Sequence, residues 1–294
     1  MIFVIVGPTG VGKSSLALKY ALENNAAIIN GDVFQCYKEM SIGTAKPSLE
    51  ERSKAPHYLF DIATVNEAYT IFDYQKDLRR TIDELLPKYK NIVIVGGSGL
   101  YLKSSLYDFT LNEQKESIDM SKYDSLTNEE LYDELLKIDE ESAKQTHPNN
   151  RKRVLRAIEI YLESGKKKSD IIASQEHKLL YDVTFIGLSK DSREELYKMI
   201  DERVIKMFDE GLLDEVKYLM NNYDIGSRAF QAIGYKELIQ GLNEEKSLPE
   251  IVSLIQKNTR NYAKRQYTYF KNQLPVNWFN TKEDAYNYMV IKGE

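Results

Sequence analysis

The stretch Gly7-Pro8-Thr9-Gly10-Val11-Gly12-Lys13-Ser14 matches the pattern G-x-x-x-x-G-K-[ST] at every fixed position. The apolar run Ile2–Val6 precedes it, and a helical pattern with Leu16 and Tyr20 on one face follows it. A strand, a glycine-rich loop and a helix in this order are the setting in which such a match forms a P-loop. The backbone N–H groups of the loop bind anionic oxygens, the Lys13 ammonium adds a positive charge, and the Ser14 hydroxyl is a suitable Mg²⁺ ligand. The sequence therefore predicts that residues 7–14 bind a polyphosphate.

Length and composition narrow the class of protein. The 294 residues leave room for one large or two moderate domains, and 42% hydrophobic with 29% charged residues is ordinary for a soluble protein. No apolar run approaches the ~20 residues that a membrane span needs, so no membrane association is expected. The single cysteine, Cys36, excludes a disulfide within the chain and a cysteine-based zinc site. An N-terminal core strand is unlike a signal peptide, so we expect a cytoplasmic protein.

The net charge of −5 conceals two segments of opposite sign. Residues 113–141 hold eleven acidic residues against three lysines, whereas residues 151–168 hold seven basic residues against two glutamates. Such segregation leaves a basic surface on an acidic protein, which suits a nucleic-acid partner. Two solvated helix faces of opposite sign explain the pattern equally well, so composition leaves both interpretations open.

Short apolar runs alternate with longer helical patterns along most of the chain. This alternation predicts an α/β fold in which a parallel sheet of P-loop NTPase or kinase type is flanked by helices. The expected strands are Ile2–Val6, Ala27–Asn30, Ile92–Val95, Val183–Leu188 and Val276–Phe279. The mostly helical segment between the third and the fourth of these strands, from about residue 110 to 181, is too long for a simple crossover. We therefore expect a P-loop core domain over residues 1–110 and 182–294, and a helical insertion domain over residues 111–181 that acts as a lid.

Two loops after predicted strands carry candidate site residues, because ligands of parallel sheets bind beyond the carboxyl ends of the strands. Asp32 follows the second strand, where a carboxylate can take a proton from a nucleophile or hold a metal through water; capping of a turn explains it equally well. Gly96-Gly97-Ser98 follows Ile92–Val95, where an ATPase usually carries an acidic residue for Mg²⁺. Two glycines there permit close approach of the backbone to a ligand, and Ser98 offers a hydroxyl. ATP hydrolysis is therefore disfavoured.

Basic residues recur in two other predicted helices. In the insertion, Leu155 and Ile158 share one face, so Lys152, Arg153 and Arg156 point elsewhere. A last long helix over residues 249–272 has a predicted buried stripe of Ile251, Ile255, Tyr262 and Tyr269. Its other face carries Lys257, Arg260, Lys264 and Lys271. This face suits a phosphate backbone, although a solvated helix face is the simpler explanation. Lys46 and His57 lie in loop-like stretches. We expect Lys46 to be a solvated lysine and His57 to be a packing histidine.

The sequence also contains the blocks GPTGVGKS, GDVFQCYKEMSIGTAKP, APHYLFDI, GGSGLYL, HPNNRKRVLRAIE, RVIKMFDEGLLDEV, AFQAIGYKEL and TRNYAKRQYTYF. In this order they resemble the tRNA dimethylallyltransferases, or tRNA isopentenyltransferases, over nearly the whole chain. The resemblance implies that a dimethylallyl group moves from dimethylallyl diphosphate to the exocyclic N6 amine of the adenosine 3′ of the anticodon of a tRNA, with release of diphosphate. It also explains the missing acidic strand end, because no γ-phosphate is hydrolysed.

The resemblance assigns roles to individual residues. It implies that the P-loop binds the diphosphate with Mg²⁺ at Ser14, that Arg203 reaches the same phosphates, and that Asp32 is the general base. Ser98 stands where the family usually has threonine. The segments that match tRNA contacts are Asp32, Val33, Phe34 and Gln35, and Lys152, Arg153, Val154, Leu155 and Arg156. Val33 replaces a usual serine, and the absence of a Cys/His zinc finger indicates the compact bacterial type, expected to be a monomer.

Two other functions fit parts of the pattern. A P-loop kinase for a small molecule or nucleoside would use Asp32 as its base and the insertion as its lid, and the P-loop itself suits ATP. A nucleotide-gated RNA-binding protein would use the same basic segments without catalysis. Transfer of a dimethylallyl group separates the prenyltransferase from both.

Overall fold

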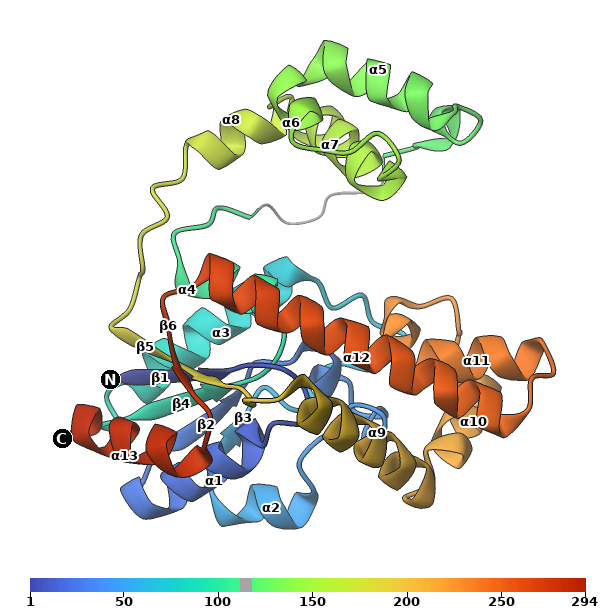
Figure 1. The fold of residues 1–294 in the computed structure, drawn as a ribbon. Helices are drawn as coiled ribbons and strands as arrows, with labels where there is room; N and C mark the ends of the chain where they lie inside the picture. The colour runs from blue at the N-terminus through green and yellow to red at the C-terminus, as the bar shows by residue number, and fades with distance from the viewer. Residues whose placement is uncertain (112–117) are drawn as a thin grey trace. The chain divides into compact units, whose positions relative to one another are not determined.

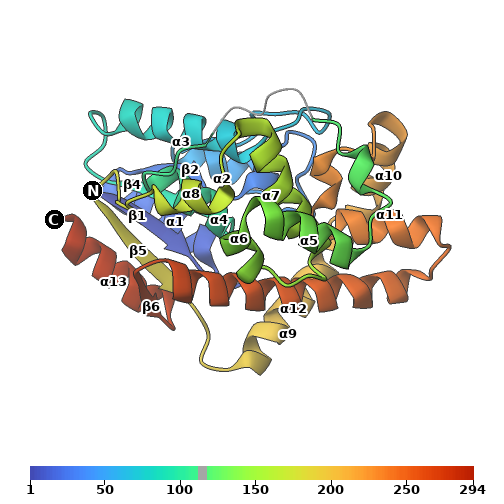
Figure 2. The same cartoon turned by 90° about the horizontal axis from the view of Figure 1, so that it is seen from above.

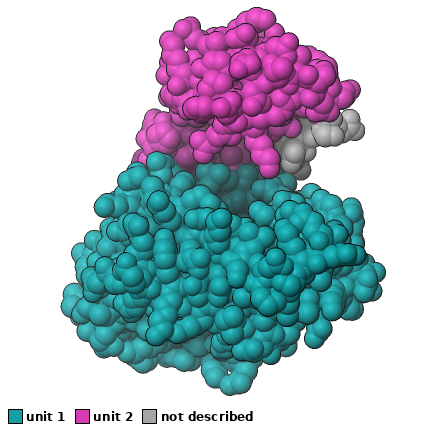
Figure 3. Space-filling view, turned by 45° about the vertical axis from the view of Figure 1, so that its right-hand side comes forward, with its two compact units in different colours: residues 1–106, 179–294 teal, residues 107–178 magenta. Residues whose placement is uncertain are grey.

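The computed structural model describes residues 1–111 and 118–294, and Glu113, Lys115 and Glu116 of the acidic segment lie outside these residues. The chain divides into two compact units, coloured separately in Figure 3. The first contains residues 1–106 and 179–294, and the second contains residues 107–178. No helix in the described part of the chain is long and apolar enough to cross a membrane.

A parallel sheet of six strands forms the centre of the first unit (Figure 1). Its strands are β1 (Ile2–Val6), β2 (Ala27–Asn30), β3 (His57–Tyr58), β4 (Ile92–Val95), β5 (Val183–Leu188) and β6 (Val276–Phe279). They lie in the order β3-β2-β4-β1-β5-β6, and all the pairings are parallel. The α/β fold predicted from the sequence is confirmed, and the five predicted strands have the predicted bounds. The two-residue strand β3 is too short to give a sequence signal.

Helices cover both faces of this sheet. Helix α1 packs against β4 and α13 on one face, whereas α3, α4 and α12 cover the other (Figure 1). The helices of this unit are α1 (Lys13–Asn24), α2 (Leu49–Lys54), α3 (Ile71–Leu85), α4 (Gly99–Leu106), α9 (Arg193–Asp209), α10 (Leu212–Asn222), α11 (Tyr235–Asn243), α12 (Leu248–Gln273) and α13 (Lys282–Gly293). Seen from above, α10 and α11 lie near one end of α12, and α13 lies at the other (Figure 2).

Uniform burial of the strands explains why their sequences do not alternate. Every residue of β1, β2 and β4 is buried, because helices cover both faces. On the α1 side, Phe3, Leu16 and Met289 share one hydrophobic cluster that joins the sheet to α1 and α13. The sheet is thereby a rigid base for the loops at the carboxyl ends of its strands.

The second unit is a small helical bundle with its own core. Its helices are α5 (Asn128–Ile138), α6 (Glu140–Lys144), α7 (Arg151–Ser164) and α8 (Lys168–Ala173). Thr127 and Glu130 form a capping box at the start of α5, and Gly165 ends α7 in the left-handed region at φ 68°. The Arg151 guanidinium donates to the carbonyl oxygens of Leu126 (2.6 Å) and Tyr123 (2.7 Å), so this arginine stabilises the bundle.

Candidate active site

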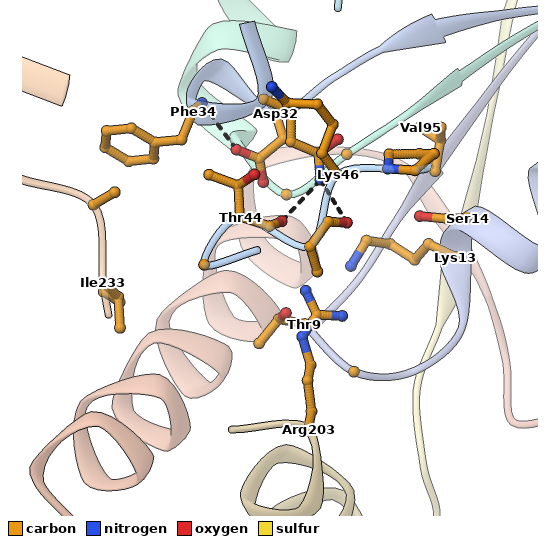
Figure 4. A pocket seen from close by; sticks show the side chains of 18 of the residues that line it. Thr9, Lys13, Ser14, Asp32, Phe34, Thr44, Lys46, Val95, Arg203 and Ile233 are labelled. Atoms are coloured by element: carbon orange, nitrogen blue, oxygen red, sulfur yellow. Dashed lines mark hydrogen bonds between the residues drawn. The ribbon is translucent and has the colours of Figure 1, made fainter. Parts of the chain in front are cut away.

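A cavity of about 590 Å³ lies at the carboxyl ends of β1, β2 and β4. The P-loop follows β1, the loop with Asp32 follows β2, and Gly96-Gly97 follows β4, so three adjacent strands bring these loops together. Helices α9 and α12 and the loop of residues 43–47 supply the other walls. Figure 4 shows Lys13 and Arg203 pointing into one space, which Asp32 faces from the other side. Residues far apart in the sequence thus share one pocket.

The P-loop has the backbone conformation that its glycines permit. Gly7, Gly10 and Gly12 have φ angles of 134°, 89° and 93°, which side chains with a Cβ rarely adopt. At Gly7 a Cβ would also lie 2.3 Å from the Leu188 carbonyl oxygen. The loop therefore requires glycine at these positions, and α1 begins at Lys13 directly after it.

Lys13 and Arg203 form a pair of half-buried cations. The Lys13 ammonium donates to the carbonyl oxygens of Gly7 (3.0 Å) and Pro8 (2.8 Å). Burial and the nearby Arg203 charge lower the pKa of Lys13 to about 7, against the opposing effect of Asp32. Burial also lowers the pKa of the Arg203 guanidinium. Two cations that are poorly solvated and close together favour an anionic ligand between them.

Asp32 combines the two roles that the sequence left open. Its Oδ1 accepts a hydrogen bond from the backbone N–H of Phe34 (3.1 Å) and so caps the short 3₁₀ helix Val33–Cys36. The half-buried side chain also lines the cavity. Burial raises the pKa of Asp32, although the Phe34 N–H, Lys13 and Arg203 oppose the shift. A carboxylate with a raised pKa facing a cavity is suited to accept a proton.

Ser98 lies beside this cavity. Its Oγ accepts a hydrogen bond from the backbone N–H of Val33 (3.1 Å), which links the loops after β4 and β2. Together with Val33, it lines a second cavity of about 330 Å³, in which the Arg228 guanidinium donates to the Tyr101 hydroxyl (2.8 Å). In this structure Ser98 therefore supports the Asp32 loop from the second cavity.

Tight packing gives a further reason for the two glycines after β4. A Cβ at Gly96 would lie 2.0 Å from the carbonyl carbon of Gly31, and one at Gly97 would lie 2.1 Å from Nε2 of Gln266. The backbone thus approaches another loop and α12 closely. Gly96 and Gly97 also line the cavity, so their close approach to a ligand stays a prediction. Gln266, which sequence reasoning missed, accepts from the Thr9 N–H (2.9 Å) and donates to the Gly97 carbonyl (3.1 Å). The sequence signal that could have identified Gln266 is its position as a polar residue within the buried stripe of α12.

Lys46 contradicts the expectation of a solvated lysine. Its side chain is only 2% exposed and pairs with Asp61 at 2.6 Å. Its ammonium also donates to the Tyr37 carbonyl (2.6 Å). These bonds compensate for the loss of water around the charge and hold the end of the loop of residues 41–47, hereafter the wall loop. The half-buried His57 also lines the cavity and contacts the Ala55 carbonyl through Nδ1 at 2.7 Å.

Comparison with known proteins decides the family. The model of the family described as IPP transferase (IPPT) matches residues 35–273, which is most of the chain. The chain belongs to the IPP transferase family. The family indicated by the sequence blocks is thereby confirmed.

Individual IPP transferases are similar along the whole chain. A tRNA dimethylallyltransferase from Bacillus licheniformis is 43% identical over 307 residues, covering 100% of this chain and 98% of that protein. The crystal structure of a tRNA delta(2)-isopentenylpyrophosphate transferase from Staphylococcus epidermidis has a TM-score of 0.73 at 37% identity, covering 99% of this chain and 97% of that one. A eukaryotic dimethylallyltransferase acting on tRNA has a TM-score of 0.83 at 28% identity, covering 100% of this chain and 80% of that one.

The insertion of this IPP transferase separates its predicted tRNA-binding residues into exposed and buried ones. Lys152 and Arg153 are exposed at the start of α7. Arg156 is half-exposed and pairs with Glu159 at 2.6 Å and Glu163 at 3.5 Å. Val154 is completely buried in the core of the bundle, and Leu155 packs against that core. Side-chain contact of Val154 with RNA is therefore corrected to a packing role.

Two features of α12 also differ from their prediction. Tyr262 and Tyr269 are only partly buried and line the two cavities, so the core stripe consists of Ile251, Ile255, Ala263, Gln266 and Phe270. Arg260 belongs to an ion pair with Asp201 of α9 at 2.5 Å. Lys257, Lys264 and Lys271 remain exposed, at a spacing of seven residues.

A divalent metal would bind through Ser14. The Ser14 side chain is exposed and lines the cavity beside Lys13. Within residues 1–111 and 118–294, no group of three or more His, Cys, Asp or Glu side chains could hold a metal ion. Mg²⁺ that shares its ligands between one hydroxyl, phosphate oxygens and waters needs no such group. The residues present therefore fit a Mg²⁺ that arrives with a diphosphate.

Proposed function

We propose that this chain transfers a dimethylallyl group from dimethylallyl diphosphate to the N6 amine of the adenosine 3′ of the anticodon of a tRNA. The observation that carries the proposal is the pairing of two half-buried cations, Lys13 and Arg203, with a carboxylate of raised pKa, Asp32, around one cavity. Membership of the IPP transferase family supports it. A diphosphate fits the cations, and a weakly acidic amine needs the base.

The reaction balances with these groups alone. The amine nitrogen attacks the carbon that carries the diphosphate, the C–O bond breaks, and the electron pair of that bond leaves with the diphosphate. The P-loop N–H groups, Lys13 and Arg203 stabilise the negative charge that develops on the leaving oxygen. Asp32 accepts the proton that the amine loses. A Mg²⁺ held by Ser14 and the diphosphate would neutralise further charge on the leaving group.

The acceptor base must leave its stack to reach this cavity. Enzymes that act on a base extrude it into a pocket, because the target atom is inaccessible within a stack. Phe34 and Gln35, which line the cavity next to Asp32, provide an aromatic ring and a carboxamide for such a base. Lys152, Arg153 and the exposed lysines of α12 provide charge for the RNA backbone. A monomer in the cytoplasm remains our expectation for the working protein.

Incubation with dimethylallyl diphosphate, Mg²⁺ and unmodified tRNA tests the proposal. Digestion of the tRNA should yield adenosine with an added dimethylallyl group, and one equivalent of diphosphate should be released. Transfer of γ-phosphate from ATP to a small molecule, with no prenylated adenosine, would instead identify a P-loop kinase and refute the proposal. tRNA binding that responds to ATP without any transfer would identify a nucleotide-gated RNA-binding protein.

A further inference from the structure

Two side chains outside the cavity hold the wall loop. Residues of this loop from Gly43 to Pro47 line the cavity. Glu215 in α10 and Tyr235 at the start of α11 contact the loop from behind. Within the described chain, neither is among the residues that line the cavity. Any effect they have on a ligand must therefore act through the loop.

The Glu215 carboxylate accepts hydrogen bonds from the backbone of the wall loop. Its Oε2 accepts from the N–H groups of Ser41 (3.1 Å) and Ile42 (2.9 Å), and its Oε1 accepts from that of Gly43 (3.3 Å). Hydrogen bonds from several N–H groups to one carboxylate are charge-assisted and stronger than neutral ones. The carboxylate thereby fixes three consecutive peptide groups.

Tyr235 contacts the same part of the loop, and Glu215 and Tyr235 together are called the clamp. Its hydroxyl donates to Glu215 Oε1 (2.5 Å) and accepts from the Gly43 N–H (3.1 Å). The Tyr235 ring is completely buried, and a Cβ at Gly43 would lie 2.4 Å from it. The loop therefore packs tightly against the ring while the carboxylate holds its N–H groups.

The clamped loop determines how the Gln35 carboxamide is oriented. Gln35 Nε2 donates to the carbonyl oxygens of Thr44 (3.0 Å) and Ala45 (3.3 Å). Since carbonyl oxygens only accept, the NH₂ group must face the loop, and rotation of the amide would lose both bonds. Gln35 lines the cavity, and its Oε1 has no hydrogen-bond partner among residues 1–111 and 118–294. The group left for a ligand is an acceptor.

We propose that Glu215 and Tyr235 are positioning residues that make Gln35 select a base with an exocyclic amine. An amine donates to the Gln35 oxygen, whereas the keto oxygen of hypoxanthine, in the same position, is a second acceptor and is repelled. The clamp keeps the amide in the selective orientation. This inference rests on the proposed function, since it needs a base in the cavity.

Binding of two stem-loop RNAs tests this selection without catalysis. Fluorescence anisotropy would compare labelled anticodon stem-loops that carry adenosine or inosine at the target position. The wild-type protein should prefer adenosine by about tenfold, the effect of replacing one good hydrogen bond by an unsatisfied pair of acceptors. In Glu215→Gln and in Tyr235→Phe this preference should fall to about threefold or less. Their double variant should show no further loss, because both residues act through one loop.

Two exposed neighbours on α10 provide matched controls. Asp214→Asn and Tyr218→Phe make the same chemical changes at exposed positions and should keep the wild-type preference. Thermal unfolding would check folding, and Tyr235→Phe, which keeps the buried ring, decides the question if Glu215→Gln does not fold. Wild-type preference retained in folded variants, or no preference in the wild type, would overturn the inference. Failure of the wild type to prenylate tRNA would instead overturn the proposed function.

Discussion

Lys13 and Lys152 both lie in the first turn of a helix, yet their surroundings are opposite. Lys13, at the start of α1, is held by two carbonyl oxygens, and burial beside Arg203 lowers its pKa to about 7. Lys152, at the start of α7, is exposed to solvent. The first lysine is suited to respond to one anion in contact with it. The second is suited to attract a polyanion over a longer distance, and dissolved salt weakens this attraction.

This comparison divides the predicted site residues into two kinds. The charges at the cavity act by exact placement in a poorly solvated site, so single substitutions there should have large effects on turnover. Exposed charges on α7 and α12 each add a small, similar amount to RNA affinity. The following substitutions test the division, beginning with the largest expected effect.

Asp32→Asn should lower turnover by about 10²–10⁴, the range for loss of a general base. The asparagine oxygen can still accept the Phe34 N–H, so the cap of the short helix is kept. Binding of inorganic diphosphate should stay the same or become tighter, because a negative charge near Lys13 is removed. Single-turnover prenylation and calorimetry with diphosphate measure the two quantities. Asp209→Asn, at an exposed position of α9, is the control. Unchanged turnover in Asp32→Asn would exclude a role as base.

The pH dependence of diphosphate binding should differ between the wild type and Lys13→Arg. Below pH 7 Lys13 is already protonated, so its titration does not affect affinity. Above its pKa of about 7, binding must first protonate the lysine, and affinity should fall by up to about tenfold per pH unit. Arginine stays charged throughout, so this part of the fall should vanish. The ratio of the two affinities from pH 6 to 9 removes the titration of diphosphate itself. A ratio that does not change with pH would contradict a neutral Lys13 in the free protein.

The smallest effect is expected at the exposed charges. Lys152→Ala combined with Arg153→Ala should weaken tRNA binding several-fold at low salt, and the slope of log affinity against log salt should decrease by about 1–2. Lys137→Ala with Lys144→Ala removes the same charge from α5 and α6, where these lysines pair with Glu134 and Glu140, and should change the slope less. Equal slopes for the two double variants would remove α7 from the RNA interface.

The sequence was sufficient for the parts of the fold that depend on local pattern. Buried runs gave five strands with their bounds, and the glycine spacing gave the P-loop, because both signals lie within a few neighbouring residues. Lys46 was misjudged, since its partner Asp61 is fifteen positions away and an isolated lysine carries no sign of burial. Val154 was assigned to RNA by its motif, although the apolar spacing of α7 includes it in the core.

The supporting residues of the site were the hardest to predict. Glu215 and Gln266 act through backbone groups more than 170 and 250 positions away, and any sequence has suitable N–H and carbonyl groups at those positions. From the sequence alone, a carboxylate on an amphipathic helix is expected to be solvated, and only the fold shows that a loop packs against it. Such residues become visible only when the chain is folded.

The Gln266 bridge has a consequence for the order in which the protein is made. The P-loop leaves the ribosome well before α12, which supplies the carboxamide that joins Thr9 to Gly97. Strand β5, which pairs with every residue of β1, is also made much later than β1. A nascent chain can therefore carry the complete P-loop sequence while it still lacks α12 and β5, which complete the site. At ~5–20 residues per second, synthesis of the 257 residues from Thr9 to Gln266 takes about 13–50 seconds, and the site is incomplete for that time.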